Sequence, residues 1–411
     1  MSSRAKASAM TGSGSLALVP KLRFLEFLEA EGWIAKKLND ICDVNPANSE
    51  LPDSFVYIDL ESVAAGELKS RKIINRDEAP SRAQRLLHSG DVIFQIVRPY
   101  QRNNLHFKAD ENIEYVASTG YAQLRAKHSS DFLFQAIHTD DFVDHVVAKC
   151  TGSSYPAINS SDLAEISISI PEPTEQQKVA DCLSSADELI AAQARKVDAL
   201  KTHKKGLMQQ LFPRAGETQP RMRFPEFKDA GEWVTKKLGE IAEVMVSGDL
   251  DTELYSSIRS EKFIHPVYAN GVESEGLYGY YAISRYQRNC ITITARGTLG
   301  IAFLRHQDFM GIGRLIVASP AQDVNSHFLK ECWSHLAKIS HEVTSIPQLT
   351  AVTARATALP FPPIQEQKRI ADCLTSIDDN ITAENNRLEA LKTHKKGLMQ
   401  QLFPAAEEVA A

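Results

Sequence analysis

The chain has 411 residues, of which 43% are hydrophobic and 24% charged, and its formal net charge is −6. This length exceeds what one hydrophobic core usually organises, so we expect two domains and a connector. The composition excludes a membrane span, because no apolar run is long enough, and the acidic balance excludes an indiscriminate polyanion-binding protein.

The N-terminal segment and the cysteines indicate a cytoplasmic protein. Residues 1–19 are rich in Ser, Ala and Gly, and the apolar run at 15–19 is too short for the core of a signal peptide. We expect a disordered leader over 1–19 and no membrane partner. The six cysteines show neither a CxxC pair nor a zinc-ligand spacing, so we expect reduced thiols and no metal site.

Residues 20–172 are predicted to form a small α/β domain. Short β-rich runs at 55–60 and 91–97 alternate with polar turns, and residues 139–149 show a helical pattern. We call this segment the first α/β domain.

A basic stretch lies within the first α/β domain, although the whole chain is acidic. Residues 69–108 hold nine Lys or Arg against three acidic residues. The run at 98–104 offers Arg for guanine edges, Gln and Asn for adenine edges, and a proline that stiffens the loop. The predicted phosphate contacts are Lys69, Arg71 and Lys72, and the further DNA contacts are Arg98, Tyr100, Gln101, Arg102, Asn103 and Asn104.

Residues 173–213 are predicted to form one long helix. It follows Pro171 and Pro173 and stops at Pro213. Apolar side chains recur along it on two interleaved seven-residue spacings, which is the pattern of a coiled coil. The seam consists of Val179, Leu183, Ala186, Ile190, Val197, Leu200, Leu207 and Leu211, interrupted by the polar residues Gln193 and Lys204.

Residues 214–362 are predicted to form a second α/β domain. Its opening at 220–241 matches 20–41 at an offset of 200 residues, so that Trp233 stands where Trp33 stood. Runs at 290–295 and 313–318 have strand patterns, and 326–336 has a helical pattern. Because the inserts after the two openings do not match, we expect the two domains to present different surfaces.

The second α/β domain also holds a basic stretch. Residues 285–314 contain five Arg against Asp308 alone, and the loops at 268–271, 284–289 and 296–300 combine turn residues with amide and guanidinium groups. Arg285 and Arg288 are predicted to contact phosphates, and Asn270 and Arg296 to contact bases. The complete predicted DNA-binding set here is Tyr268, Asn270, Arg285, Tyr286, Arg288, Arg296 and Thr298.

Residues 363–404 are predicted to form a second long helix before a short tail at 405–411. Fifteen residues at 390–404 are identical to 199–213, 191 positions earlier. The seam therefore recurs, with polar interruptions at the equivalent Glu384 and Lys395. Its apolar members are Ile370, Leu374, Ile377, Ile381, Leu388, Leu391, Leu398 and Leu402.

Two such seams in one chain predict a specific architecture. The fold class is α+β, with two small α/β domains separated by two long antiparallel coiled-coil helices in a pseudo-two-fold internal repeat. A duplicated frame around unlike inserts suits a protein that presents two recognition surfaces at a fixed spacing. Three alternatives stay open: a fossil duplication, helices that pack only on their own domains, and basic loops that are ordinary solvated surface.

The repeated segments resemble a known family. Residues 171–183 and 362–374, each leading into LysLysGlyLeuMetGlnGlnLeuPhePro, are similar to the conserved regions of type I restriction-modification specificity subunits (HsdS). The two openings, the phrase at 90–100 and GlySerSerTyrProAlaIleAsn at 152–159 also resemble that family. The second copy departs at 342–350, which lacks the Gly of 152–159.

The resemblance implies a non-catalytic subunit that reads DNA. It implies two target recognition domains, each reading half of an interrupted double-stranded site, and conserved helices that dock two modification subunits. Those subunits would bind S-adenosylmethionine and methylate adenine, and two restriction subunits that use ATP and Mg would join for cleavage. The docking and coiled-coil residues would be Leu183, Ile190, Val197, Leu200, Leu207, Leu374, Ile381, Leu388, Leu391 and Leu398.

The chain itself shows no motif of an enzyme. AsnProAlaAsn at 45–48 only superficially resembles the motif of amino-methyltransferases, and neither a Gly-rich S-adenosylmethionine loop nor GxxxxGK[ST] accompanies it. We therefore expect no catalytic residues and no cofactor bound by this chain. The remaining rival is a coiled-coil scaffold that presents two protein-binding domains, which would hold two protein ligands and show no salt-sensitive affinity for DNA.

Overall fold

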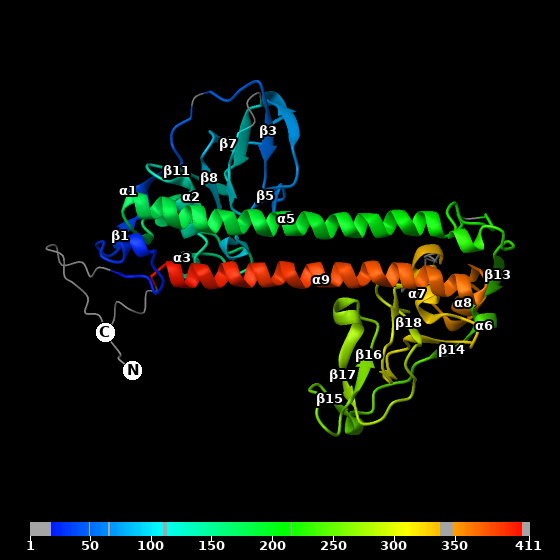
Figure 1. Cartoon of the computed structure of the whole chain (residues 1–411). Coiled ribbons are helices and arrows are strands. Elements are labelled where there is room, and N and C mark those ends of the chain that lie inside the picture. The colour runs from blue at the N-terminus through cyan, green and yellow to red at the C-terminus, as the bar shows by residue number, and fades with distance from the viewer. Residues whose placement is uncertain are drawn as a thin grey trace. The chain divides into compact units, whose positions relative to one another are not determined.

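The computed structural model describes residues 18–48, 50–64, 66–109, 113–214, 216–337 and 348–404. Most of the predicted leader, the tail at 405–411 and residues 342–347 of the departing segment lie outside these ranges. The chain forms two compact units, each shown in Figure 1. Unit 1 comprises 1–193 with 387–411, and unit 2 comprises 194–386.

Unit 1 contains the first α/β domain. Its four-stranded sheets have the orders β6-β3-β10-β7 and β2-β11-β8-β9, and β1-β12 and β4-β5 are two-stranded. The elements are η1 (Leu25–Phe27), β1 (Ile34–Lys37), α1 (Leu38–Ile41), β2 (Cys42–Val44), β3 (Ser54–Ile58), β4 (Val63–Ala64), β5 (Glu67–Leu68), β6 (Lys72–Asn75), η2 (Arg76–Glu78), β7 (Ala83–Leu86), β8 (Val92–Gln95), η3 (Pro99–Gln101), β9 (Leu105–His106), β10 (Tyr115–Ser118), β11 (Tyr121–Ala126), α2 (Ser130–Ala136), α3 (Asp140–Ala148), α4 (Ser160–Ala164), β12 (Ser167–Ile170) and the first part of α5 (Pro173–Leu211).

Unit 2 contains the second α/β domain. Its four-stranded sheets have the orders β14-β21-β18-β19 and β15-β17-β16-β20, and β13-β22 is two-stranded. The elements are η4 (Pro225–Phe227), β13 (Val234–Lys237), α6 (Leu238–Ile241), β14 (Ala242–Val246), η5 (Thr252–Leu254), β15 (Tyr255–Ser256), β16 (His265–Tyr268), η6 (Glu273–Gly276), β17 (Leu277–Tyr281), β18 (Ile291–Ile293), β19 (Ala302–Leu304), β20 (Met310–Gly311), β21 (Ile316–Pro320), α7 (Ser326–Leu336), α8 (Ala351–Ala356), β22 (Ala358–Phe361) and the first part of α9 (Ile364–Leu402).

Most elements predicted from local pattern are confirmed, because their patterns match their burial, but the strand predicted at 313–318 begins only at Ile316, after a turn at Gly313 and Arg314. Strand β8 is buried at all four positions, as its continuous apolar run predicts for a central strand. Helix α3 begins where the hydroxyl of Thr139 accepts a hydrogen bond from the backbone N–H of Phe142. Asn325 caps α7 in the same way through Phe328. These two helices correspond to the helical patterns at 139–149 and 326–336.

One sheet has the same topology in the two inserts despite their unlike sequences, whereas the other places its parallel pair at the centre in unit 1 and at an edge in unit 2. In each unit one four-stranded sheet is wholly antiparallel. The other sheet contains one parallel pair, β3 with β10 in unit 1 and β16 with β20 in unit 2. Strand patterning preserves a sheet as long as the buried face stays apolar, and it leaves the loops between strands free to vary. The two domains thus offer different loops on similar frames.

The two long helices pair in antiparallel fashion along the predicted seam. Within unit 2, Lys196 contacts Glu384 and Lys204 contacts Asp378, so residue numbers fall along α9 as they rise along α5. The seam positions are buried or half-buried, with Leu183, Val197 and Leu374 almost fully covered. Coiled-coil packing of both helices is therefore confirmed.

The polar interruptions of the seam are paired. In unit 1 the Nζ of Lys395 lies 2.6 and 2.7 Å from the two carboxylate oxygens of Asp187. In unit 2 the equivalent Lys204 lies 2.8 and 2.7 Å from those of Asp378. Burial alone would lower the pKa of Lys204, but the carboxylates of Asp378 and Glu331 outweigh it and hold that pKa above its usual value. Such pairs hold register because a shift would leave a charge unpaired.

Each α/β domain is anchored on its helices by a buried carboxylate. Glu175, near the start of α5, accepts two hydrogen bonds from Arg23 at 2.8 and 2.7 Å and one from the indole of Trp33 at 3.3 Å. In unit 2, Glu366 accepts two from Arg223 at 2.8 and 2.7 Å. Bidentate hydrogen bonds of this kind fix the orientation of the arginine relative to the carboxylate as well as the distance between them. The repeated openings of the two domains therefore serve to anchor them.

The ends of the helices complete the domain cores. In unit 1, Phe403 after α9 packs edge-on against Trp33, with ring centroids 5.5 Å apart. In unit 2, Phe212 after α5 packs against Trp233 at 6.1 Å and Phe328 at 5.5 Å. The identical sequence at the two helix ends thus fills equivalent positions in both cores. Deleting a buried Phe of this kind typically lowers stability by about 3–5 kcal/mol.

Candidate nucleic-acid interface

The loop at 98–104 of the first α/β domain is tightly constrained. Arg98 and Arg102 flank η3, and both adopt left-handed backbone angles, with φ of 55° and 53°. A bulky side chain rarely adopts this conformation, which is strained and is common at functional sites. The loop is thus held in one shape by its surroundings.

One edge of this loop presents exposed side chains. The guanidinium of Arg98 lies 4.2 Å from the centre of the Tyr155 ring, and Tyr155 is 66% exposed. Tyr100 and Gln101 are also exposed. The aromatic contact orients the guanidinium, but Arg98 is half-buried and its Nε is covered without a hydrogen-bond partner, so base reading would fall to the terminal nitrogens. Tyr155 was not predicted as a site residue, although it lies in the family phrase at 152–159.

Two predicted DNA contacts of this loop are engaged inside the domain. Asn104 is fully buried, where its Oδ1 accepts from the N–H of Gln95 at 2.8 Å and its Nδ2 donates to His138 at 3.2 Å. Arg102 donates to the carbonyl of His138 at 3.0 Å and to Asp140 at 2.7 Å. Both side chains hold the loop against α2 and α3, so the structure gives them a positioning role. Asn103 is half-buried, and its N–H donates to Gln95.

The predicted phosphate contacts of the first domain lie at the surface. Lys69, Arg71 and Lys72 are exposed at the end of β5 and the start of β6. Lys69 forms an ion pair with Glu67, which is itself exposed. An exposed pair of this kind is weak and can exchange partners. The position of these three residues therefore permits contact with a polyanion.

In the second α/β domain, three of the predicted arginines are exposed. Arg285 and Arg288 lie in the loop before β18, and Arg296 lies with the exposed Thr298 in the loop from β18 to β19. The backbone N–H of Arg288 donates to Asp308 at 2.9 Å, which orders that loop. Each of these loops therefore carries exposed positive charge.

The remaining predicted residues of this domain are engaged from within. Tyr286 is 3% exposed and stacks on Phe309, and burial raises the pKa of its hydroxyl. The side chain of Asn270 donates to the carbonyl of Gly313 and accepts from the N–H of Ala295, each at 2.7 Å. Their geometry therefore supports the exposed loops from beneath.

Arg305 corrects the predicted basic stretch. It was counted among the five arginines of 285–314, yet it is 1% exposed. Its guanidinium stacks 3.5 Å from the ring centre of Tyr268 and donates to the carbonyl of Glu275 at 2.8 Å. Burial lowers the pKa of Arg305 to about 10. No local pattern marks this arginine as internal, because only the tertiary fold closes over it.

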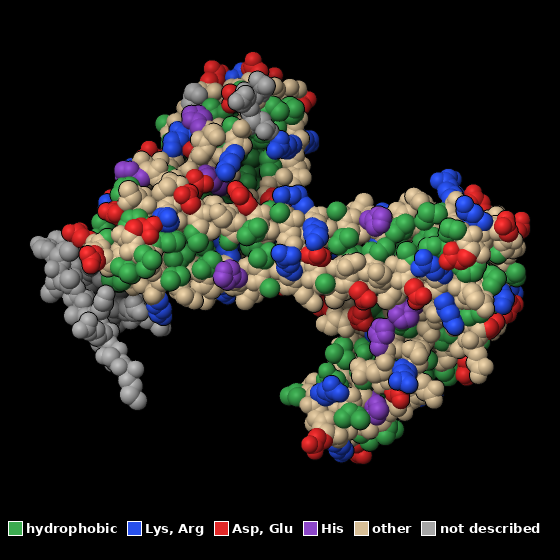
Figure 2. Space-filling model, viewed as in Figure 1, with side chains coloured by type: hydrophobic (Ala, Val, Ile, Leu, Met, Phe, Trp, Pro, Cys, Tyr) green, Lys and Arg blue, Asp and Glu red, His purple; other side chains and the backbone are tan. Residues whose placement is uncertain are grey.

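Charge on the visible surface is mixed in sign. Figure 2 shows Lys and Arg side chains interspersed with Asp and Glu over both units. The net charge of −6 agrees with this picture. Any nucleic-acid contact must therefore depend on particular loops and not on a broad basic surface.

The described residues contain no group of three or more His, Cys, Asp or Glu arranged to hold a metal. All six cysteines are free thiols, and burial raises the pKa of Cys42 to about 12, so this thiol is a poor nucleophile. Within the described ranges, no helix is long and apolar enough to cross a bilayer.

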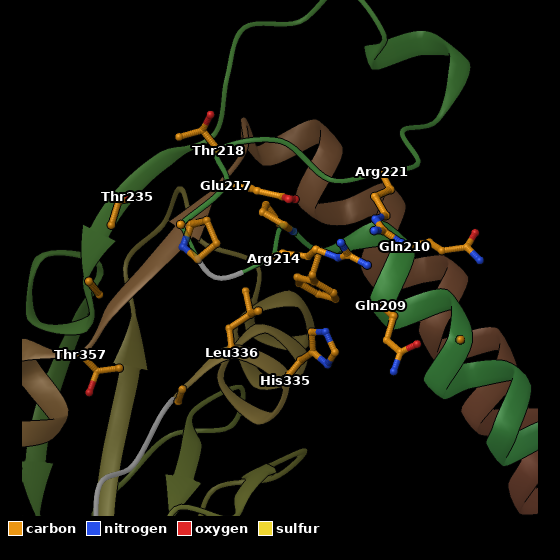
Figure 3. A pocket seen from close by; sticks show the side chains of 17 residues that line it. Gln209, Gln210, Arg214, Glu217, Thr218, Arg221, Thr235, His335, Leu336 and Thr357 are labelled. Atoms are coloured by element: carbon orange, nitrogen blue, oxygen red, sulfur yellow. The ribbon is translucent and has the colours of Figure 1, made fainter.

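A cavity of about 950 Å³ lies in unit 2, away from the predicted DNA contacts. Figure 3 shows Gln209 and Gln210 on the last turns of α5, with Arg214 and Arg221 in the segment that follows and His335 at the end of α7. None of its lining residues belongs to the predicted DNA-binding set. The cavity lies at the end of α5, where the chain continues into the second α/β domain.

Comparison with known sequences identifies the family. A family model described as the type I restriction modification DNA specificity domain matches the chain twice, at residues 30–202 and 230–393. A putative type I specificity subunit of Mycoplasma pneumoniae is 24% identical over 54% of this chain and 58% of its own length. The putative MjaX specificity subunit of Methanocaldococcus jannaschii is 24% identical over 60% of each chain. The match thus spans somewhat over half the length of these relatives.

Solved structures share the fold. The type I S subunit from M. genitalium aligns with a TM-score of 0.63 at 16% identity, covering 94% of this chain and 100% of that one. A chain from a study of type I R-M complex assembly and conformational transition aligns with a TM-score of 0.53 at 22% identity, covering 91% and 98%. Since the family model matches most of the sequence in two copies, the chain belongs to the type I restriction modification DNA specificity domain family.

Proposed function

We propose that this chain is the sequence-specific DNA-recognition subunit of a type I restriction-modification complex. The observation that carries the proposal is the combination of two similar sheet frames with two unlike sets of exposed arginine loops. Each domain would read one half of a bipartite double-stranded site. Exposed residues such as Lys72 and Arg285 would supply salt-dependent phosphate contacts, and Arg98 and Arg296 would contact base edges.

The paired helices would set the unread gap between the half-sites. Each helix has 39 residues, which corresponds to roughly 58 Å at 1.5 Å per residue. The seam leaves one face of each helix for partners, and we propose that two modification subunits dock there. Two restriction subunits would join the complete complex. Catalysis, S-adenosylmethionine, ATP and Mg would belong to those partners, and the assembly would work in the cytoplasm.

The first test is methylation mapping. The chain would be expressed with the modification subunit encoded beside it in a host free of methylation, and adenine methylation would be mapped genome-wide by single-molecule sequencing. We expect a bipartite motif with a fixed gap. An assembled complex that methylates nothing would contradict the proposal.

The alternative function is a scaffold that presents two protein-binding domains. It is favoured by the mixed-sign surface, which is less basic than that of most DNA-binding domains. Fluorescence anisotropy on duplex DNA across a salt series separates the two functions. A DNA reader shows affinity that falls steeply with salt, whereas the scaffold shows none.

A further inference from the structure

The turn between β20 and β21 places an arginine in an unfavourable conformation. Gly313 and Arg314 both have positive φ, at 68° and 66°, and the N–H of Leu315 donates to the carbonyl of Ile312 across them. This is the geometry of a two-residue type I′ turn, in which Gly and Asn are strongly preferred. Arg at the second position brings strain that Gly would avoid, which points to a use for its side chain.

Asn270 links this turn to the loop of Arg296. Its amide donates to the carbonyl of Gly313 and accepts from the N–H of Ala295, each at 2.7 Å. These two backbone groups immediately precede Arg314 and Arg296 in the chain. The side chain of Asn270 therefore holds the backbone next to each of the two arginines and ties their loops together.

Both arginines are available to a ligand. Arg296 and Arg314 are exposed, and neither guanidinium has a hydrogen-bond or ion-pair partner among the residues that the structure describes. By contrast, Arg305 is buried against Tyr268. Buried Arg305 supports the Tyr268 loop, and the exposed pair faces outward with its donors unused.

We infer that Arg314 and Arg296 form a paired base-reading edge of the second α/β domain, and that Asn270 is the positioning residue that sets their separation. This inference rests on the proposed DNA-recognition function and assigns residues within it. The chemistry that matches is guanine, since an arginine fork donates to its O6 and N7 in the major groove. Arg314 thus joins the DNA contacts, and Asn270 acts through its neighbours.

The test compares four full-length chains, each assembled with the modification subunit: wild type, Arg314→Gly, Arg314→Lys and Asn270→Ala. A duplex pool randomised in both half-sites is selected by binding and sequenced. Arg314→Gly relieves the turn, so its melting temperature should not fall, yet preference at one G·C pair should weaken by roughly ten- to a hundredfold. Arg314→Lys keeps the charge but should lose the same preference.

Asn270→Ala should weaken the base preference at the positions read by both arginines together, whereas Arg314→Gly should weaken it at one position only. The half-site read by the first α/β domain is the internal control and should be unaffected. Unaltered selectivity in Arg314→Gly, or full selectivity in Arg314→Lys, would overturn the inference while wild-type selection upheld the proposed function. A wild-type complex that selects no duplex would remove both.

Discussion

Arginine plays opposite roles at different positions of this chain. Arg98 and Arg314 sit on strained turns, the first half-buried and the second exposed, while Arg305 is stacked in the interior and Arg102 clamps a loop. The residue type is the same, and its burial and partners decide the role. This distinction guides which substitutions should alter specificity directly and which should act through loop position.

Arg102→Ala should reduce the free-energy discrimination between bases in the half-site read by the first domain by roughly 1–3 kcal/mol. Discrimination in the other half-site should not change. If Arg102 positions the loop through Asp140, then Asp140→Ala should produce the same change, because it removes the same anchor. Competition binding with single-base variants of each half-site measures both. Loss of selectivity in both halves together would contradict independent domains, and a silent Asp140→Ala would show that Arg102 contacts the base itself.

His138 should make stability depend on pH. Burial lowers the pKa of this imidazole to about 4, opposed by the hydrogen bond to the Phe134 carbonyl and by Asp187, and aided by the nearby Lys395 and Arg102. Its Nδ1 donates to the carbonyl of Phe134 at 2.6 Å, and its Nε2 accepts from Asn104, which requires the neutral ring.

Between about pH 6.5 and pH 4 this histidine is protonated in the unfolded chain, where its pKa is near 6.5, but stays neutral in the folded chain. Stability is therefore fully present above about pH 6.5 and falls as the pH drops toward 4, by on the order of 3 kcal/mol. Denaturant unfolding at pH 7.5, 6 and 5 measures the slope. His138→Gln should flatten it, and an equal slope in both proteins would refute the assignment.

At the scale of elements, the polar residues of the seam fix the register of the two helices, which apolar residues alone would allow to slide along each other. Lys395 and Asp187 in unit 1 repeat as Lys204 and Asp378 in unit 2. In each unit the α/β domain also reaches this pair, through Gln135 to Asp187 at 2.8 Å in unit 1 and through Glu331 in unit 2. The pairs therefore tie each domain to its helices as well as fixing the register.

Lys395→Met should lower the unfolding free energy by about 1 kcal/mol, because it removes the largely covered cation of the pair and leaves the partly exposed Asp187 with Gln135 as its remaining donor. Lys196→Met is the matched control. Its pair with Glu384 is about half exposed on the lysine side, so the loss should stay under about 1 kcal/mol. Equal effects of the two substitutions in urea titrations would argue against a special role for the Lys395 pair.

At the scale of the whole molecule, the helices link the two domains covalently, so their length should control the site that is recognised. Inserting one heptad into both α5 and α9 preserves the phase of the seam and should lengthen the tolerated gap in the DNA site. Methylation mapping of the assembled complex reads the gap directly. An insertion of three residues in each helix is the control, because it breaks the seam and should abolish assembly. An unchanged gap after the heptad insertion would show that helix length does not set the spacing of the two half-sites.

The sequence by itself determined the frame of this protein. The 191-residue repeat and the two apolar seams predicted the paired helices, since a 3.5-residue period over this length can be buried only against another helix. Strands such as β8 and helices such as α7 followed from local patterns of period two and 3.6. The family resemblance followed from the same repeated segments.

Only the tertiary structure decided the role of each side chain in the loops. Asn104 and Arg296 have similar polar surroundings in sequence, yet one is fully buried and the other exposed. Likewise, the sequence places Arg305 in a basic stretch, but the folded domain buries it. The inferred role of Arg314 depends on its turn, whose Gly313 carbonyl accepts from Asn270, 43 residues earlier in the chain. Burial and long-range hydrogen bonds depend on contacts between distant residues, and a local pattern carries no record of those contacts.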